Sequence, residues 1–177
     1  VSAGTRTGLV LQVDDPAQLG ADIVTGAAAA VWLYGTPVAV LDFGTATVLS
    51  CVDANRTLLG VSIAPGMQTS LDGLRGAAAL IPHVELRAPE SVLGRNTADS
   101  VRAGVVYGTA AMADGLVERT LREAHLPPDT PVVATGGLAG LILPFCRRRM
   151  HREDALTLYG LYRVFALTAR REALRKK

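Results

Sequence analysis

The sequence predicts an α/β fold in which a mixed β-sheet is flanked by helices. Stretches typical of helices and strands follow in the order helix, three strands, two helices, strand, two helices. Hydrophobic residues make up 49% of the 177 residues, which suits one large or two small globular units with a core. No linker, internal repeat or low-complexity segment interrupts this order.

The first half of the chain supplies a helix and then a small β-meander. Asp15 and Pro16 are a helix start signal, and the alanine-rich stretch 17–35 follows them until Gly35 and Pro37. Apolar or alternating stretches predict strands at 38–44, 46–53 and 58–66. The sequence ANRT forms the turn between the second and third strands.

The second half is mainly helical. The leucine-containing stretch 67–81 predicts a helix that ends at Pro82, and residues 96–125 predict a long helix with small residues on its middle turns. A short buried strand, VVATGG, follows a group of prolines. Helices are then expected at 138–149 and at 155–175.

Composition limits the kind of partner and the compartment. The formal net charge is +2, and the basic excess lies mostly at 147–149 and 170–177. A basic tail is typical of a solvated helix end, with contact to nucleic acid or membrane as the alternative. Because aromatic residues are not interleaved with basic ones, we expect no nucleic-acid partner. Without a signal peptide or a long apolar run, we expect no membrane partner and a cytoplasmic location.

The cysteines and histidines do not form a metal-binding pattern. Cys51 and Cys146 lie in apolar surroundings without CxxC or Cys/His spacing, which indicates buried reduced thiols. His83, His125 and His151 are scattered among loop-like residues, and we expect them to face solvent.

The stretch Asp42-Phe43-Gly44-Thr45 is the first candidate site. A carboxylate at a strand end, followed by a glycine turn and hydroxyl groups, can bind a cation while backbone N–H groups face phosphate oxygens. The alternative is that Asp42 and Thr45 only close a hairpin.

The stretch VVATGG is the second candidate. A buried strand that delivers Gly136 and Gly137 to a helix start lets the backbone approach a nucleotide closely, although a helix-packing turn would have the same glycines. The order of the two candidates is that of the actin, sugar kinase and acetate kinase superfamily. In that order the first element contacts phosphates and the second holds adenosine.

Several separated motifs narrow the resemblance from a superfamily to one family. The stretches TGLVLQVDDPAQLGAD, DFGTAT, GVSIAPGMQTSLDGL, LIPHVEL, GRNTADSVRAGVVYG and ATGGLAGLI together resemble the type III pantothenate kinases over nearly the whole chain. The resemblance implies a ribonuclease H-like or actin-like ATPase lobe, the C-terminal lobe of such a kinase. It further implies a single lobe over 1–177, with a substrate helix within 1–36 and a long dimer helix within 37–177.

The family phosphorylates the terminal hydroxyl of pantothenate with ATP, the first step of coenzyme A synthesis, as a homodimer using Mg²⁺ and K⁺ or NH₄⁺. By resemblance, Asp22 is the catalytic base and Asp42 the ligand of the monovalent cation. The residues implied to contact pantothenate are Gly20, Ala21, Asp22, Ile23 and Thr97. Those implied to contact ATP are Gly44, Thr45, Gly136 and Gly137.

Two departures from the family pattern leave alternatives open. Ile23 stands where the family has an arginine that could pair with the pantothenate carboxylate, a loss of about 1.5–3 kcal/mol unless Arg6, Arg95 or a partner residue substitutes. The sequence also starts after the family's N-terminal lobe with its DxGNT phosphate loop. We therefore expect low activity alone, whether the sequence is part of a longer chain, a split enzyme with a partner chain carrying that lobe, or a degenerate paralogue.

Two functions other than catalysis are also compatible with the sequence. The main alternative is a non-catalytic, pseudokinase-like subunit that dimerises with an intact kinase chain and stabilises it. A DNA-binding accessory regulator rests only on the basic tail. The apolar and small residues of the long helix 96–125 predict a two-fold interface, or else a central core helix.

Overall fold

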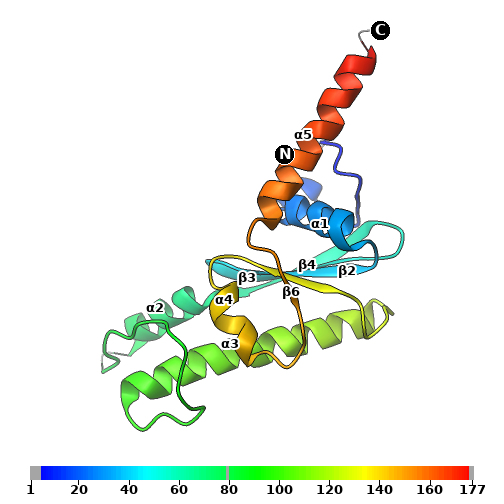
Figure 1. Ribbon diagram of the computed structural model, residues 1–177. Helices are drawn as coiled ribbons and strands as arrows, with labels where there is room; N and C mark the ends of the chain where they lie inside the picture. The colour runs from blue at the N-terminus through cyan, green and yellow to red at the C-terminus, as the bar shows by residue number, and fades with distance from the viewer. Residues whose placement is uncertain (1–4, 79, 176–177) are drawn as a thin grey trace.

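The computed structural model describes residues 5–78 and 80–175, and these form a six-stranded mixed sheet with helices on both faces (Figure 1). The elements in chain order are β1 Val10–Leu11, η1 Pro16–Gln18, α1 Ala21–Tyr34, β2 Val38–Phe43, β3 Ala46–Val52, β4 Thr57–Pro65, α2 Met67–Ala77, α3 Thr97–Glu123, β5 Val132–Thr135, α4 Ala139–Ile142, η2 Leu143–Phe145, β6 His151–Arg152 and α5 Leu156–Arg175.

The strand order is β1-β4-β3-β2-β5-β6. Strands β2, β3 and β4 form an antiparallel meander, while β5 runs parallel to β2 on its other side. Asp42 lies opposite Val48 of β3 and opposite Thr135 of β5. The carboxyl ends of β2 and β5 therefore meet at one edge of the sheet, where open α/β sheets bind their ligands.

Helices cover the two faces of the sheet in separate layers. Helices α2, α3 and α4 lie on one side, and α1 with α5 lies on the other (Figure 1). Successive residues of β2 point to opposite faces. Leu41 and Phe43 join the core under α3, whereas Val38 and Val40 join the core under α1. The same alternation directs Asp42 towards α1.

The predicted α/β class with a mixed, helix-flanked sheet is confirmed. The three meander strands, the long helix and the strand before Gly136 lie where they were expected. Strands β1 and β6, of two residues each, were not predicted.

Three predicted helices have wrong boundaries. The helix expected at 67–81 ends at Ala77, and the backbone is extended at Ala78. The first helix begins at Ala21 instead of residue 17, because Asp15 caps a separate 3₁₀ turn through the N–H of Ala17 at 2.9 Å and the chain is extended at Leu19. The helix expected at 138–149 is only α4 followed by η2. Pro144 lies within η2 and lacks the N–H that a continuing helix needs.

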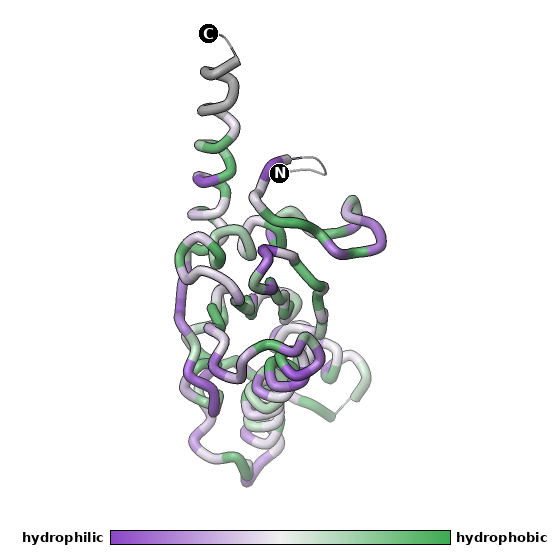
Figure 2. Tube along the Cα trace, turned by 90° about the vertical axis from the view of Figure 1, so that its right-hand side faces the viewer, coloured by the Kyte–Doolittle hydropathy of each residue, from purple (hydrophilic) through white to green (hydrophobic). Residues whose placement is uncertain are grey.

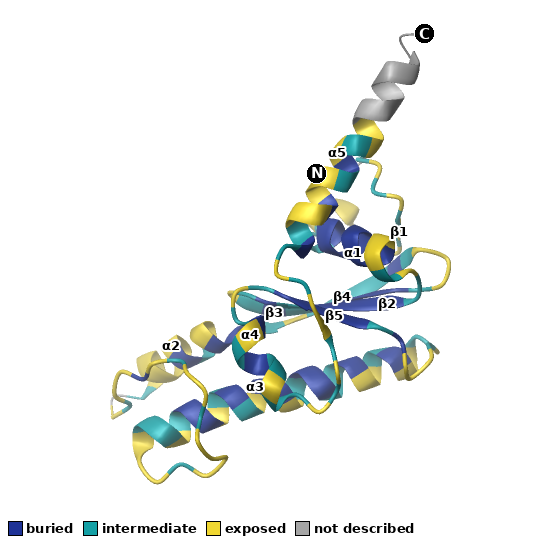
Figure 3. Cartoon of the chain, viewed as in Figure 1, coloured by how far each residue is buried: buried dark blue, intermediate teal, exposed yellow. Residues whose placement is uncertain are grey.

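Cys51 is buried as predicted, whereas Cys146 is only half-buried, and both are free thiols. The three histidines are exposed. Figure 3 shows the buried residues concentrated in the sheet and on the helix faces that pack against it. Within 5–78 and 80–175 no helix is long and apolar enough to cross a membrane.

Candidate active site

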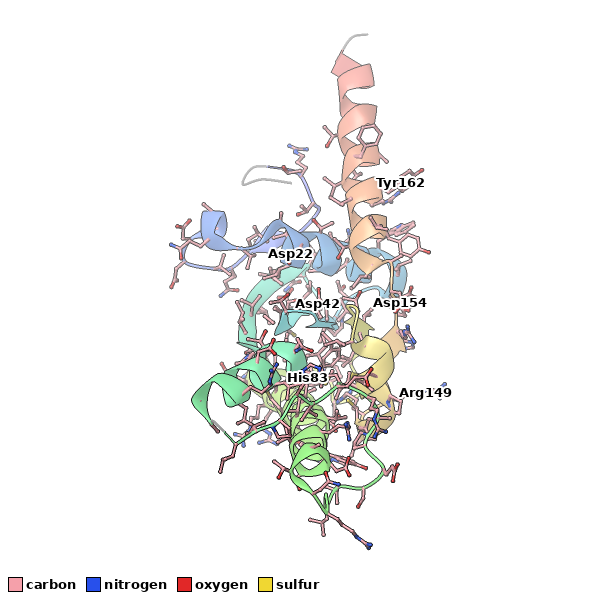
Figure 4. All side chains as sticks on the ribbon, turned by 90° about the vertical axis from the view of Figure 1, so that its left-hand side faces the viewer. Asp22, Asp42, His83, Arg149, Asp154 and Tyr162 are labelled. Atoms are coloured by element: carbon pink, nitrogen blue, oxygen red, sulfur yellow. The ribbon has the colours of Figure 1, made fainter. Side chains whose placement is uncertain are left out.

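Asp42 and Asp22 come from different elements and face the same small cavity. Asp42 is the next-to-last residue of β2, and Asp22 is the second residue of α1 (Figure 4). The cavity has a volume of about 20 Å³, which is enough for about one water molecule. Its lining residues are Asp22, Ile23, Gly26, Val40, Asp42, Val48, Ser50, Thr135 and Thr157.

The start of α1 positions Asp22. Gly20 is the N-cap, and the backbone turns from extended to helical there, so Asp22 lies in the first turn of α1 instead of in the middle of the helix. A carboxylate in this position is favoured by the helix dipole. Asp22 is exposed and folds back over Gly20, where a side chain would meet its carboxylate. The carboxylate is therefore open to a ligand, and Gly20 leaves room for it.

Burial and charge shift the titration of Asp42. Desolvation is the larger cause and the negative charge of Asp22 the second, and both raise the pKa of Asp42 above its usual value of 3.8. A bound cation would favour the charged form and reverse this shift.

The turn after Asp42 is held from one side by the start of α2. The N–H of Gly44 donates to the carbonyl of Ala46 at 3.0 Å, which closes the turn. The carbonyl of Thr45 accepts from the N–H of Gly66 at 3.0 Å and from Oγ1 of Thr69 at 2.7 Å. A Cβ at Gly66 would overlap the carbonyls of Gly44 and Thr45.

The second predicted turn touches the first. Gly136 has a φ of +93°, and a Cβ there would overlap both the carboxylate of Asp42 and the carbonyl of Phe43. The N–H of Leu138 donates to that carbonyl at 3.1 Å. Gly137 is exposed beside it, between β5 and α4. The two glycine turns thus form one continuous surface at the sheet edge.

Not every predicted residue joins this group. Gly20, Ala21, Asp22 and Ile23 begin α1, and Ile23 is half-buried with its aliphatic side chain lining the cavity. Thr97 is the first residue of α3, exposed, on the opposite side of the sheet from α1 (Figure 1). One copy of the chain therefore does not bring Thr97 and Asp22 to the same face.

Sequence reasoning missed several residues of the site. Ser50 and Thr135 are buried polar residues that line the cavity from β3 and β5, and Thr157 lines it from the first turn of α5. Gly66 and Thr69 hold the turn at Thr45. A glycine followed three residues later by a threonine at a predicted helix start was the available signal.

The cavity offers oxygen ligands but few carboxylates. No group of three or more His, Cys, Asp or Glu side chains that could hold a metal ion occurs among the residues that the structure describes. The available donors are the carboxylates of Asp22 and Asp42 and the hydroxyl groups of Ser50, Thr135 and Thr157. Oxygen donors of this kind suit hard cations.

The mixed sheet and the paired turns define a lobe of the actin-like ATPase fold. A conserved Baf family protein from Campylobacter jejuni, proposed as a transcriptional activator, superposes with a TM-score of 0.63 at 16% identity, over 93% of this chain and 71% of that one. The activator of the 2-hydroxyisocaproyl-CoA dehydratase from Clostridium difficile, with bound ADPNP, gives a TM-score of 0.50 at 12% identity, over 88% of this chain and 69% of that one. At these identities the likeness concerns the fold.

Sequence comparison then gives the family. The family model for type III pantothenate kinase matches residues 1–119. The type III pantothenate kinase of Frankia casuarinae is 42% identical over 165 residues, which cover 93% of this chain and 65% of that protein. The chain belongs to the type III pantothenate kinase family. It spans about 65% of the length of the curated relatives it matches.

Proposed function

We propose that this chain forms one kinase-like lobe that binds ATP and pantothenate and transfers the γ-phosphoryl group to the pantothenate hydroxyl, giving phosphopantothenate. The observation that carries the proposal is the convergence of Asp22, Asp42 and the Gly136 turn at the carboxyl ends of β2 and β5. Phosphoryl transfer needs positioning and charge stabilisation more than covalent help from the protein.

Each residue has a separate part in this proposal. The exposed carboxylate of Asp22 accepts the proton of the attacking hydroxyl, while Gly20, Ala21 and Ile23 contact pantothenate. The turn of Gly44 and Thr45 contacts the ATP phosphates. Gly136 and Gly137 let the nucleotide approach the backbone.

The donors fit a monovalent cation better than a magnesium site made by protein alone. Asp42 would hold K⁺ or NH₄⁺ together with nearby hydroxyl oxygens, in a cavity of mixed carboxylate and hydroxyl character. Mg²⁺ usually binds one or two carboxylates together with substrate phosphates, so it would arrive with ATP. When bound, these cations neutralise charge on the transferring phosphoryl group.

A homodimer is part of the proposal because of Thr97. Asp22 and Thr97 can contact one pantothenate only if they come from two copies, since they lie on opposite sides of the sheet. An apolar groove of about 560 Å³ runs between α2 and α3, lined mainly by Pro65, Leu74, Val101, Gly104, Val105, Gly108 and Met112. Its glycines allow close helix approach, and we assign this groove to the second copy.

Formation of phosphopantothenate tests the function. The assay contains ATP, Mg²⁺, K⁺ and pantothenate, with the chain alone and with the chain joined to the third of the Frankia casuarinae relative that lies outside the match. We expect turnover to disappear in Asp22→Asn and to persist in the control Asp129→Asn, an exposed loop residue. Activity that survives in Asp22→Asn contradicts the assigned base.

A non-catalytic subunit is the second candidate, and Ile23 favours it. An aliphatic side chain lines the cavity where the family resemblance places an arginine, so the carboxylate of pantothenate lacks that partner. If folded protein binds an intact kinase chain but shows no turnover in any mixture, the chain is a non-catalytic subunit and the proposed kinase function is wrong. In either case we propose a cytoplasmic location.

A further inference from the structure

A polar pocket lies between the first turns of α3 and the loop that precedes it. Residues 80–96 lead from α2 to α3 by way of the lowest turn in Figure 1. Figure 2 shows hydrophobic residues flanked by hydrophilic ones in this loop, at the bottom of the view. The cavity has a volume of about 670 Å³ and is lined by Pro89, Glu90, Ser91, Leu93, Gly94, Arg95, Asp99 and Arg102. We call it the loop pocket.

The start of α3 fixes one wall of the loop pocket. Asn96 is the N-cap, and its side chain accepts from the N–H of Asp99 at 2.9 Å. Gly94 packs directly against the backbone of the first turn, where a Cβ would overlap the nitrogen of Ser100. The loop is therefore held close to the helix, and the walls of the pocket belong to the folded structure.

Arg102 lines the loop pocket as a charged side chain that is only 8% exposed. Its Nε donates to the carbonyl of Glu85 at 3.1 Å, and its Nη1 donates to the carboxylate of Asp99. A guanidinium has five N–H groups, and the other three have no partner among the residues that the structure describes. Burying unused donors of a charged group is costly, so an acceptor inside the pocket would stabilise this arrangement.

The other charges of the loop pocket indicate the kind of ligand. Both carboxylate oxygens of Asp99 are occupied, because Oδ1 accepts from Arg102 and Oδ2 accepts from Nδ2 of Asn96 at 2.7 Å. Arg95 and Glu90 line the same pocket, and within 5–78 and 80–175 neither side chain forms an ion pair. Two guanidinium groups are thus available for an oxyanion, while Glu90 can accept from a donor on the same molecule.

The loop pocket is separate from the residues proposed to contact pantothenate. Thr97 and Arg102 are five residues apart on α3, so their side chains point about 140° away from each other around the helix. Asp22 and Asp42 face the α1 side of the sheet, whereas α3 lies on the other side (Figure 1). A molecule in the loop pocket would therefore be a second ligand and not the acceptor of the phosphoryl group.

We propose that the loop pocket binds a small organic molecule that carries both an oxyanion and a hydrogen-bond donor, as amino acids and aminoalkyl phosphates do. Arg95 and Arg102 bind the oxyanion, which is a carboxylate or a phosphate, and Glu90 accepts from the ammonium or hydroxyl group of the ligand. The volume of the pocket lies within the range of small-molecule sites. The proposal rests on this pocket alone and does not depend on the proposed function.

Titration followed by nitrogen–proton NMR tests the proposal. L-Serine and phosphoethanolamine each combine an ammonium group with one of the two oxyanions, whereas acetate and inorganic phosphate lack this donor. We expect L-serine, phosphoethanolamine or both to shift the backbone amides of 90–95 and 99–102, with a dissociation constant of about 1 mM. The matched anion without the donor should bind about tenfold more weakly. If neither compound shifts these amides at about 20 mM, or if the shifts occur only around Gly44 and Gly136, the proposal is wrong.

Substitutions of exposed residues supply the second measurement and leave the buried anchor Arg102 in place. Arg95→Ala should weaken binding of the ammonium compounds about tenfold, because one charged partner of the oxyanion is lost. Glu90→Gln should reduce their binding to that of acetate or inorganic phosphate. The control is Arg119→Ala, an exposed arginine of α3 outside the pocket, which should bind unchanged. Equal affinity of all three variants and the unsubstituted chain would overturn the proposal.

Discussion

The burial of Asp42 predicts how the stability of the chain depends on pH. Its pKa is raised above 3.8, first by burial and then by Asp22. The folded chain therefore keeps this proton where the unfolded chain has released it, and the free energy of unfolding falls as the pH rises from about 3.8 through the raised pKa. We expect Asp42→Asn to remove this fall, and Asp22→Asn to reduce it.

Urea unfolding at a series of pH values between about 3 and 8 measures the effect. Above the raised pKa, Asp42→Asn should be more stable than the unsubstituted chain, even though the proposed cation ligand is lost. An unchanged slope in Asp42→Asn would show that other groups cause the pH dependence.

Gly136 and Gly137 are neighbours with different structural requirements. Gly136→Ala places a Cβ at φ +93° against the Asp42 carboxylate and the Phe43 carbonyl. We expect it to lower the free energy of unfolding by about 1–3 kcal/mol. A Cβ at Gly137 meets nothing within 4 Å. Gly137→Ala should therefore change stability by less than about 0.5 kcal/mol in the same denaturant titration, and equal losses in both variants would contradict this assignment.

At the level of elements, regular hydrophobic patterns predicted β2, β3, β4, β5 and α3 correctly. The alternation in residues 38–66 and the small residues of 96–125 are local signals that tertiary contacts reinforce. Contacts distant in sequence explain the two strands that were not predicted. The two-residue strands β1 and β6 exist through pairing with β4 and β5.

Some residues of the candidate site likewise have local sequence signals, whereas others come together only through packing. The positions of Asp42 and of the Gly136 turn at strand ends could be predicted from the stretches that contain them. The meeting of Asp22 with Asp42 depends on the packing of α1 on the sheet, for which the sequence alone has no local signal. Ser50, Thr135 and Thr157 line the cavity from three elements and were not predicted for that reason.

The segment after η2 depends on one buried carboxylate. Asp114 of α3 accepts from the N–H groups of Arg147 and Arg148 at 2.7 and 3.1 Å. We expect Asp114→Ala to cost about 1.5–3 kcal/mol of stability, because two charge-assisted hydrogen bonds are lost. The control is Glu118→Ala on the same helix, whose exposed pair with Arg122 should contribute less than about 0.5 kcal/mol. Similar losses for both variants in urea unfolding would argue against the anchoring role of Asp114.

For the whole molecule, substitutions in the groove between α2 and α3 should affect the stability of the single chain and its dimerisation differently. Gly104 and Gly108 line the groove, and a Cβ at either position meets nothing within 4 Å of the single chain. Leucine has a higher helix propensity than glycine by roughly 0.5–1 kcal/mol per site. Gly104→Leu with Gly108→Leu should therefore leave the folded single chain as stable as before or more stable. In the proposed dimer the added side chains fill the space that the partner helix needs.

Light scattering after size-exclusion chromatography separates these effects. We expect the double variant to be monomeric at concentrations at which the unsubstituted chain is dimeric, with a melting temperature that no longer depends on protein concentration. Gly115→Leu is the matched control, because it lies on the same helix, outside the groove, with nothing within 4 Å of its Cβ position. It should gain helix propensity and remain dimeric. If the double variant still dimerises, the interface lies elsewhere. The proposed contact of Thr97 with the pantothenate site of a second copy would then need a different dimer arrangement.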